Sequence, residues 1–135
     1  MIRELDDRLW VSGQVAPHEV AELARNGVTM LVNNRPDGED ADQPPGGAIE
    51  AAAEQAGIAY RFVPIIRGIG PADVQSMQEA LCEAGDGKLL AFCRSGTRSA
   101  LALGLAMRAG GVSVEEIERR VTDAGFDIGP IAHLL

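Results

Sequence analysis

Cysteine and histidine are scarce in this chain. Its 135 residues include two cysteines, Cys82 and Cys93, and two histidines, His18 and His133, which lack the spacing of metal ligands. Two cysteines are too few for a disulfide framework or a zinc ribbon. We therefore expect the protein to hold no metal ion and no other cofactor.

Positive charge is scarce as well. Lys88 is the only lysine, and the formal net charge is −8. This excess of negative charge argues against nucleic acid and against an anionic membrane surface as partners. A site for an anion must then be built locally, from arginine side chains and backbone amides.

Long apolar runs are missing too. The sequence has no run of about 18 apolar residues, so it predicts no transmembrane helix. Glu4, Asp6 and Asp7 stand where a signal peptide needs a basic and then an apolar segment, and we expect a cytoplasmic protein. The length predicts one domain over residues 1–135.

What the chain does contain is an alternation of apolar, strand-like segments with helical patterns. The expected strands are 9–13, 28–33, 58–65 and 88–92. The expected helices are 16–27, 48–57, 71–87, 98–111, 113–125 and 127–135. This alternation predicts an α/β fold with a small, mainly parallel sheet and helices on both faces. Residues 34–47, rich in Asp, Gly and Pro, are expected to form a long loop, and such loops are often functional.

The segment LLAFCRSGTRSALALGLAM (89–107) places Cys93 between a buried strand and a helix. In parallel sheets, ligands bind beyond the carboxyl ends of the strands. The backbone amides of residues 94–98 can curl around an anion there, Gly96 permits the tight turn, and Arg98 offers a bidentate contact. These features favour a Cys93 thiolate near neutral pH. Cys82 has no basic neighbour and is expected to be structural.

Further polar residues are candidates for the same anion site. Ser99 is expected to donate a hydrogen bond to the sulfur. Arg67, in a loop beside the expected pocket, is either an anion contact or a solvated arginine. Arg35 is either a second anion contact or a partner that holds Glu39 in the long loop. The loop between nucleophile and arginine contributes Arg94, whose side chain is expected to point outward, Ser95, Gly96 and Thr97.

The stretch FCRSGTRS resembles both the Cys–Arg loop of tyrosine and dual-specificity phosphatases and the active-site loop of rhodanese sulfurtransferases. Together with DDRLWVSGQVAPHEV and GIAYRFVPI, it makes residues 3–110 similar to the phosphatase-like domain of the beta-lactamase-hydrolase-like proteins. The resemblance implies a dual-specificity-phosphatase-like fold in which Cys93 is the nucleophile and Arg98 binds the anion. Some members of the family are joined to a domain that oxidises persulfides, so a persulfide-oxidising enzyme is a candidate partner.

Two departures from the phosphatase pattern bear on the chemistry. The loop from Cys93 to Arg98 has six residues, as in rhodanese-type enzymes, whereas tyrosine phosphatases have seven. The segment that matches the general-acid loop of phosphatases holds only Asp73, which is either that acid or a carboxylate at a helix start. Asp37 and Glu39 can supply the acid only if the long loop folds over the pocket. Without an acid, a phosphatase loses about 10²–10⁴-fold in rate.

These departures favour a cysteine-dependent sulfurtransferase of the rhodanese type. A Cys93 persulfide would form from thiosulfate or a low-molecular-weight persulfide and pass its sulfur to a thiol acceptor. The alternative is a phosphatase that hydrolyses phosphate monoesters through a phosphocysteine. A third possibility is an anion-binding module without catalysis. In all three, the ligand is a small anion containing sulfur or phosphorus.

Overall fold

Five strands form one sheet in the order β1-β2-β5-β3-β4 in the computed structural model, which describes residues 2–135. The strands are β1 (Ile2–Glu4), β2 (Leu9–Ser12), β3 (Val28–Asn33), β4 (Ala59–Phe62) and β5 (Lys88–Phe92). β1 runs antiparallel to β2, and the other neighbours are parallel. The expected α/β fold with a mainly parallel sheet is confirmed.

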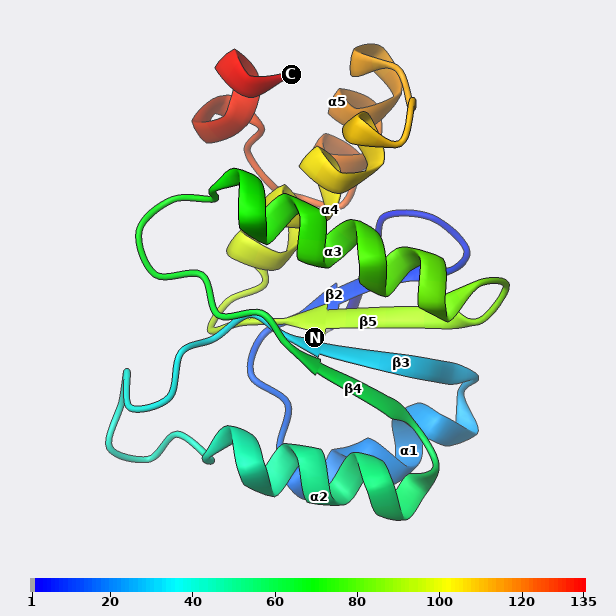
Figure 1. Cartoon of the computed structure of the whole chain (residues 1–135), viewed down its shortest axis with the longest axis vertical. Helices are drawn as coiled ribbons and strands as arrows, with labels where there is room; N and C mark the ends of the chain where they lie inside the picture. Colours follow the sequence, from blue (N-terminus) through cyan, green and yellow to red (C-terminus); the bar gives the residue numbers. More distant parts are fainter. Residues whose placement is uncertain (1) are drawn as a thin grey trace.

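Helices cover both faces of the sheet (Figure 1). One face carries η1 (Pro17–Glu19), α1 (Val20–Arg25) and α2 (Gly46–Ala56). The other carries α3 (Pro71–Ala84), α4 (Thr97–Ala109), α5 (Val114–Asp123) and η2 (Gly129–Leu134). None of the helices described for residues 2–135 is both long and apolar enough to cross a membrane.

The central strand β5 supplies side chains to a hydrophobic core on each side of the sheet. Leu89 and Ala91 pack into the core under α3 and α4, whereas Leu90 and Phe92 pack into the core over α1 and α2. Successive side chains of a strand point to opposite faces, so a strand buried on both faces is apolar throughout. This is why KLLAF has no polar alternation and why its carboxyl end is held rigidly.

The structure differs from the sequence expectations at both ends of the chain. Strand β1 was not expected, because Ile2–Glu4 is exposed and has no apolar alternation; it forms by pairing with β2. The expected last helix, 127–135, is a short 3-10 helix with a proline in its first turn. Short 3-10 segments of this kind are common as terminal pieces.

Candidate active site

Three loops meet at the carboxyl edge of the sheet. They are residues 34–45 after β3, 63–70 after β4 and 93–96 after β5, and they lie together at the left of Figure 1. Because β3, β4 and β5 are adjacent and parallel, their carboxyl ends share one edge. A site was expected at this edge on the assumption that the strands are adjacent and parallel. The structure confirms that arrangement of strands.

Cys93 directly follows β5 and is buried beneath the loops at this edge of the sheet. Its side chain is buried, with 1% of the residue exposed, and its Sγ accepts a hydrogen bond from the backbone N–H of Gly96 at 3.1 Å. Gly96 is the N-cap of α4 and adopts a left-handed φ of 96°, which turns its amide toward the sulfur. An amide donor at a helix N-terminus stabilises a thiolate.

Arg98 stands in the first turn of α4, at the mouth of the same loop. Its guanidinium donates to both carboxylate oxygens of Glu39, with Nη1–Oε2 at 2.8 Å and Nη2–Oε1 at 2.9 Å. Nη1 also donates to the backbone carbonyl of Ile65 at 3.0 Å. Hydrogen bonding to Glu39 raises the pKa of Arg98, and the nearby Cys93 acts in the same direction. The arginine is therefore charged and holds a planar oxyanion in a bidentate grip.

Glu39 is ionised in this arrangement. The hydrogen bonds from Arg98 lower the pKa of the carboxyl group to about 2, with Arg35 adding to the effect and burial opposing it. A carboxyl group with such a pKa has no proton to donate at neutral pH. Glu39 was considered as a general acid on condition that the long loop folds over the pocket. The side chain does reach Arg98 at the pocket, but it is present there as a carboxylate.

Arg35 is buried beneath the long loop. Its Nε donates to Glu39 at 2.9 Å, one Nη to Asp40 at 2.8 Å and the other to Gln14 at 3.0 Å. Of the two roles considered for Arg35, the structure shows the one that holds Glu39 and the loop. Each of its three guanidinium nitrogens donates to one of these side chains.

Ser99 does not donate to the Cys93 sulfur, contrary to expectation. Its hydroxyl donates to Oδ1 of Asn34 at 2.8 Å. Asn34 is fully buried, and it also donates from its side chain to the Val63 carbonyl at 2.9 Å and from its backbone to the Phe92 carbonyl at 2.8 Å. Asn34 thus ties the loop after β3 to the loop after β4, to the end of β5 and to α4. Asn34 was not among the residues expected from the sequence, although a pair of polar residues at the end of a buried strand is a signal for such a position.

Asp37 and Asp73, the two candidate general acids, both lie at helix starts. Asp37 accepts a hydrogen bond from the N–H of Gly46, the first residue of α2, at 2.7 Å. Asp73 accepts from the N–H of Gly70, the N-cap of α3, at 2.9 Å. Carboxylates are stabilised at such positions by the unpaired amides and the helix dipole. The structural role considered for Asp73 is therefore the one observed, and Asp37 has an equivalent one.

The remaining candidates lie at the rim. Arg94 is exposed and approaches Asp40 at 3.6 Å, which agrees with the expectation that its side chain points outward. Ser95 and Thr97 are exposed, and their hydroxyl oxygens lie 3.3 Å apart. Arg67 is exposed and lines a hollow together with Arg98. Cys82, on α3, is exposed on the surface rather than packed in the core. Within residues 2–135, no three His, Cys, Asp or Glu side chains are grouped so as to hold a metal ion.

The sequence model for the phosphatase-like domain of beta-lactamase hydrolase-like proteins matches residues 1–111. The chain belongs to this family. The match includes the three loops, Cys93 and Arg98, and ends just after α4, so α5 and η2 lie outside it. The resemblance drawn from the sequence over residues 3–110 is confirmed.

Two similar proteins, one of them of known structure, support this family assignment. The Beta-lactamase hydrolase-like protein of Xylella fastidiosa is 39% identical over 130 residues, which are 95% of this chain and 30% of the relative. The chain therefore spans less than a third of the length of this relative. A candidate phosphatase from Neisseria meningitidis of known structure is 32% identical, with a TM-score of 0.80 over 98% of this chain and 94% of its own.

The wider fold is that of dual-specificity and tyrosine phosphatases. Human DUSP28 superimposes with a TM-score of 0.65 and 26% identity, over 93% of this chain and 83% of its own. The chain thus has a phosphatase-type enzyme fold, as the sequence resemblance implied. Its buried cysteine and its arginine stand at the carboxyl edge of the sheet, where such a fold binds its ligand.

Proposed function

We propose that the chain is a cysteine-dependent phosphatase that hydrolyses phosphate monoesters with weakly basic leaving groups. The observation that carries this proposal is the geometry of the nucleophile: Cys93 Sγ receives the Gly96 amide at the start of α4, and Arg98 grips an oxyanion one turn away. The membership in a phosphatase-like family and the phosphatase-type fold support it.

In the first step, the substrate phosphoryl group replaces the Glu39 carboxylate in the fork of Arg98. The Cys93 thiolate then attacks phosphorus, an S–P bond forms and the P–O ester bond breaks. The leaving oxygen keeps the bonding electron pair and departs as a phenolate or carboxylate anion. Arg98 and the amides at the start of α4 stabilise the charge on the phosphoryl oxygens in the transition state.

In the second step, water attacks the phosphocysteine. The S–P bond breaks, the sulfur recovers its electron pair as a thiolate, and inorganic phosphate leaves with the water oxygen. Glu39 returns to Arg98 as phosphate departs. The cycle consumes one water molecule and needs no oxidant or metal.

The leaving group is restricted by the carboxylates around the site. Asp37 and Asp73 accept backbone amides at helix starts, and Glu39, once displaced from Arg98, still has Arg35 beside it, which favours its ionised form. A group with no acid to protonate it leaves well only if it is a weak base, as the oxygens of aryl and acyl phosphates are. We therefore propose aryl or acyl phosphates as substrates rather than phosphoserine.

Sulfur transfer is the second candidate, and the short loop together with the lack of a free acid favours it. The Cys93 thiolate would attack the outer sulfur of thiosulfate, the S–S bond would break, and sulfite would leave with the electron pair. An acceptor thiolate would then attack the outer sulfur of the Cys93 persulfide and restore the Cys93 thiolate. This chemistry requires no proton donor, and a persulfide-oxidising enzyme would be a consumer of the product.

One experiment separates the two chemistries. The protein is incubated with p-nitrophenyl phosphate, with a phosphoserine peptide and with thiosulfate, while product release and intact mass are followed, and Cys93→Ser is the control. Catalytic hydrolysis of the aryl ester without a stable adduct supports the phosphatase. A gain of one sulfur atom from thiosulfate, lost on adding thiol, together with negligible hydrolysis, would replace it by the sulfurtransferase. No reaction with any of the three would leave an anion-binding module.

A further inference from the structure

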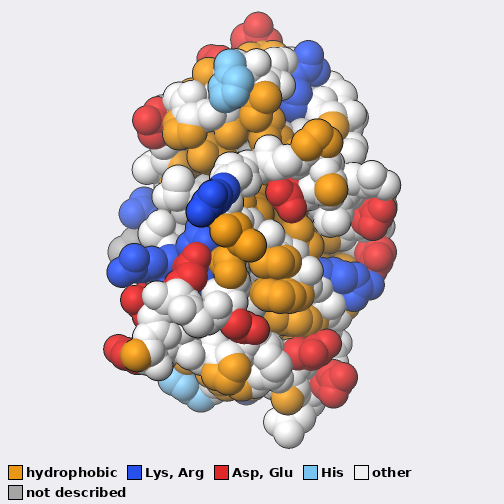
Figure 2. All heavy atoms as spheres, turned by 60° about the vertical axis from the view of Figure 1, so that its left-hand side comes forward, with side chains coloured by type: hydrophobic (Ala, Val, Ile, Leu, Met, Phe, Trp, Pro, Cys, Tyr) orange, Lys and Arg blue, Asp and Glu red, His pale blue; other side chains and the backbone are white. Residues whose placement is uncertain are grey.

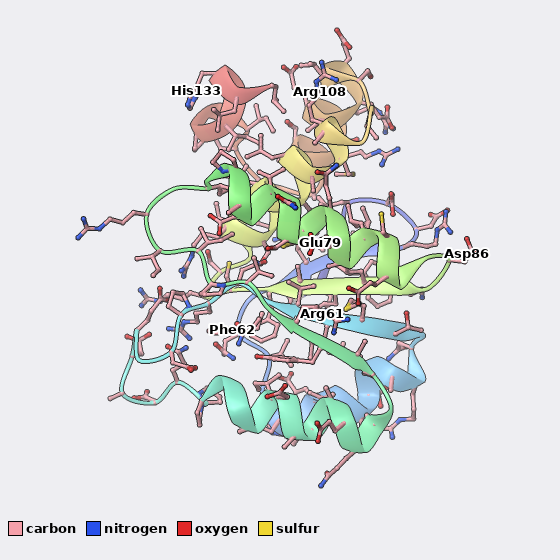
Figure 3. All side chains as sticks on the ribbon, in the orientation of Figure 1. Arg61, Phe62, Glu79, Asp86, Arg108 and His133 are labelled. Carbon is pink, nitrogen blue, oxygen red and sulfur yellow. The ribbon has the colours of Figure 1, made fainter. Side chains whose placement is uncertain are left out.

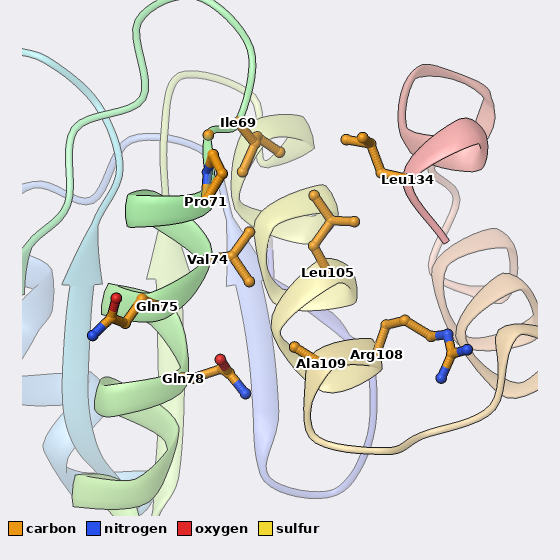
Figure 4. A pocket seen from close by; sticks show the side chains of 10 residues that line it. Ile69, Pro71, Val74, Gln75, Gln78, Leu105, Arg108, Ala109 and Leu134 are labelled. Atoms are coloured by element: carbon orange, nitrogen blue, oxygen red, sulfur yellow. The ribbon is translucent and has the colours of Figure 1, made fainter.

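Two adjoining hollows extend from the anion site along α4. The first, of about 430 Å³, is lined by Arg67 and Arg98. The second, of about 470 Å³, lies between α3, α4 and η2 (Figure 4). Ile69, Gly70 and Leu134 line both hollows, so the two form one groove, here called the α4 groove. Each hollow has the size of a small-molecule site.

One stripe of α4 forms the floor of the α4 groove. Arg98 and Leu101 line the first hollow, and Leu105 and Arg108 line the second. These residues are three or four positions apart, so they share one face of the helix. At 1.5 Å per residue, about 15 Å separate the two ends. The groove therefore begins at the residue that binds the anion and runs nearly the length of the helix.

The lining of the groove is unlike the rest of the surface. The chain has 20 Asp and Glu residues, yet neither hollow is lined by any of them. Arg98 and Arg67 lie at one end, and Arg108 lies at the other, where it donates to the carbonyl of Leu135 at 3.3 Å. Figure 3 shows Arg108 and His133 beyond α3 from the sheet, on the same end of the molecule.

The middle of the groove is apolar. Figure 4 shows Val74 of α3 facing Leu105 of α4, with Leu134 of η2 closing the opposite side. Hydrophobic side chains also gather on the face of the molecule that carries the loops (Figure 2). Leu134 is 51% exposed and lines both hollows, so its side chain is accessible to a ligand in the groove. An apolar surface that starts at an arginine and avoids carboxylates complements a ligand with an anionic head and an apolar body.

We propose that the α4 groove binds the organic part of the substrate, and that this part is an extended apolar group. The inference rests on the proposed function for the position of the anionic head at Arg98. Combined with the need for a weakly basic leaving group, it specifies an aryl or acyl phosphate whose apolar group lies between α3, α4 and η2. Residues of η2 would then determine specificity, and they lie outside the part of the chain that matches the family.

The test is the binding of methylphosphonate, butylphosphonate and octylphosphonate, which are not hydrolysed. Affinity is measured by titration calorimetry, and occupation of the anion site by protection of Cys93 from alkylation. Each buried methylene lowers Kd by up to about fourfold. Because ordering the chain costs part of this gain, we expect octylphosphonate to bind at least about tenfold more tightly than methylphosphonate.

Three variants locate the apolar part of the ligand. Leu134→Gln should weaken binding of butylphosphonate and octylphosphonate, because Leu134 lines both hollows. Ala109→Phe should weaken only octylphosphonate, because Ala109 lines the far hollow. Ile2→Gln, a change of the same kind at a residue 42% exposed on β1, should leave all three affinities unchanged.

The outcomes distinguish the two proposals. If all three phosphonates protect Cys93 with equal affinity, the groove proposal is wrong and the phosphatase proposal stands. If none of them binds or protects Cys93, both are wrong. If the protein dimerises in sedimentation experiments and Leu134→Gln abolishes the dimer, the groove is occupied by a second copy, and the proposal is overturned.

Discussion

The carboxylate of Glu39 fills the fork of the Arg98 guanidinium, in the place that a substrate oxyanion is expected to take. The two residues are 59 positions apart in the chain; Glu39 lies in the loop after β3, and Arg98 lies in the first turn of α4. Arg35 holds the carboxylate from the other side. An anion that binds to Arg98 must therefore displace a partner that the protein itself supplies.

Replacing Glu39 with a neutral side chain should strengthen anion binding. A partly exposed ion pair is worth at most about 1 kcal/mol, so we expect Glu39→Gln to lower the inhibition constant of inorganic phosphate by up to about fivefold. Asp42→Asn, which removes the same charge from the exposed part of the same loop, is the control. Weaker inhibition in Glu39→Gln would mean that Glu39 serves to orient Arg98.

Glu39 should also make the fold sensitive to acid. Its pKa is lowered from 4.5 to about 2 in the folded protein, chiefly by Arg98, so its contribution to stability is complete above its ordinary pKa. That contribution is lost as the pH falls from about 5 toward 2, because the unfolded chain then binds a proton that the folded chain does not. The melting temperature of Glu39→Gln should decline less over this range than that of the unchanged protein. Parallel curves would show that the ion pair adds nothing to folding.

The two cysteines should react in the opposite order to their exposure. Cys82 is exposed and Cys93 is buried, yet Cys93 has the Gly96 amide and Arg98 beside its sulfur. We expect iodoacetate at about pH 6.5 to alkylate Cys93 faster than Cys82, since a thiolate reacts and an arginine attracts the anionic reagent. Peptide mapping by mass spectrometry measures both rates, and added phosphate should slow only Cys93. Faster reaction at Cys82 without phosphate protection would remove the case for an activated nucleophile.

Arg98→Lys should behave as a severe substitution. A lysine ammonium is a point charge and cannot reproduce the two parallel hydrogen bonds that Glu39 now receives. We expect KM for an aryl phosphate to rise and kcat to fall, because the oxyanion is held in both the ground state and the transition state. Arg25→Lys, on the exposed surface of α1, is the matched control and should retain near-normal kcat. Near-normal kinetics for Arg98→Lys would place the anion elsewhere.

Gly96 should tolerate alanine poorly. Its φ of 96° is left-handed, and a Cβ there would lie 3.2 Å from Cζ of Phe126. We expect Gly96→Ala to lower the free energy of unfolding by roughly 1–2 kcal/mol or more and to slow alkylation of Cys93, since the amide that faces the sulfur must move. Gly38→Ala is the control, because Gly38 has a left-handed φ of 78° and open space around it. This substitution should therefore lower the free energy of unfolding only through the strained backbone conformation. Equal effects of both substitutions on stability, with unchanged Cys93 reactivity, would contradict this role.

The parts of the site that could be predicted from the sequence are those encoded locally. A buried strand, a turn and a helix follow one another without a break in residues 88–109, so the placement of Cys93, Gly96 and Arg98 after the strand, in the turn and in the helix could be predicted locally. The partners of these residues depend on tertiary structure. Ser99 meets Asn34 across 65 positions, and nothing local distinguishes this partner from the nearer Cys93 sulfur.

The same distinction explains the fold. The four longer strands were expected, because each lies in a segment rich in apolar, β-branched or aromatic residues. Strand β1 is exposed and forms by antiparallel backbone pairing with β2, in which Arg3 lies opposite Val11. Its short, charged sequence carries no signal of its own.

The loop of residues 34–45 is fastened at both ends, by buried Arg35 near its start and by the hydrogen bond from Gly46 to Asp37 near its close. The exposed positions of this loop can therefore accept substitutions while buried Asn34 and Arg35 keep the loop in place. Glu39 is one of these exposed positions, and its carboxylate occupies Arg98. This one residue therefore sets the threshold of binding free energy that an anion must exceed to displace it from Arg98. A substitution at this one position is expected to change that threshold while leaving the strand, the turn and the helix that carry Cys93 and Arg98 untouched.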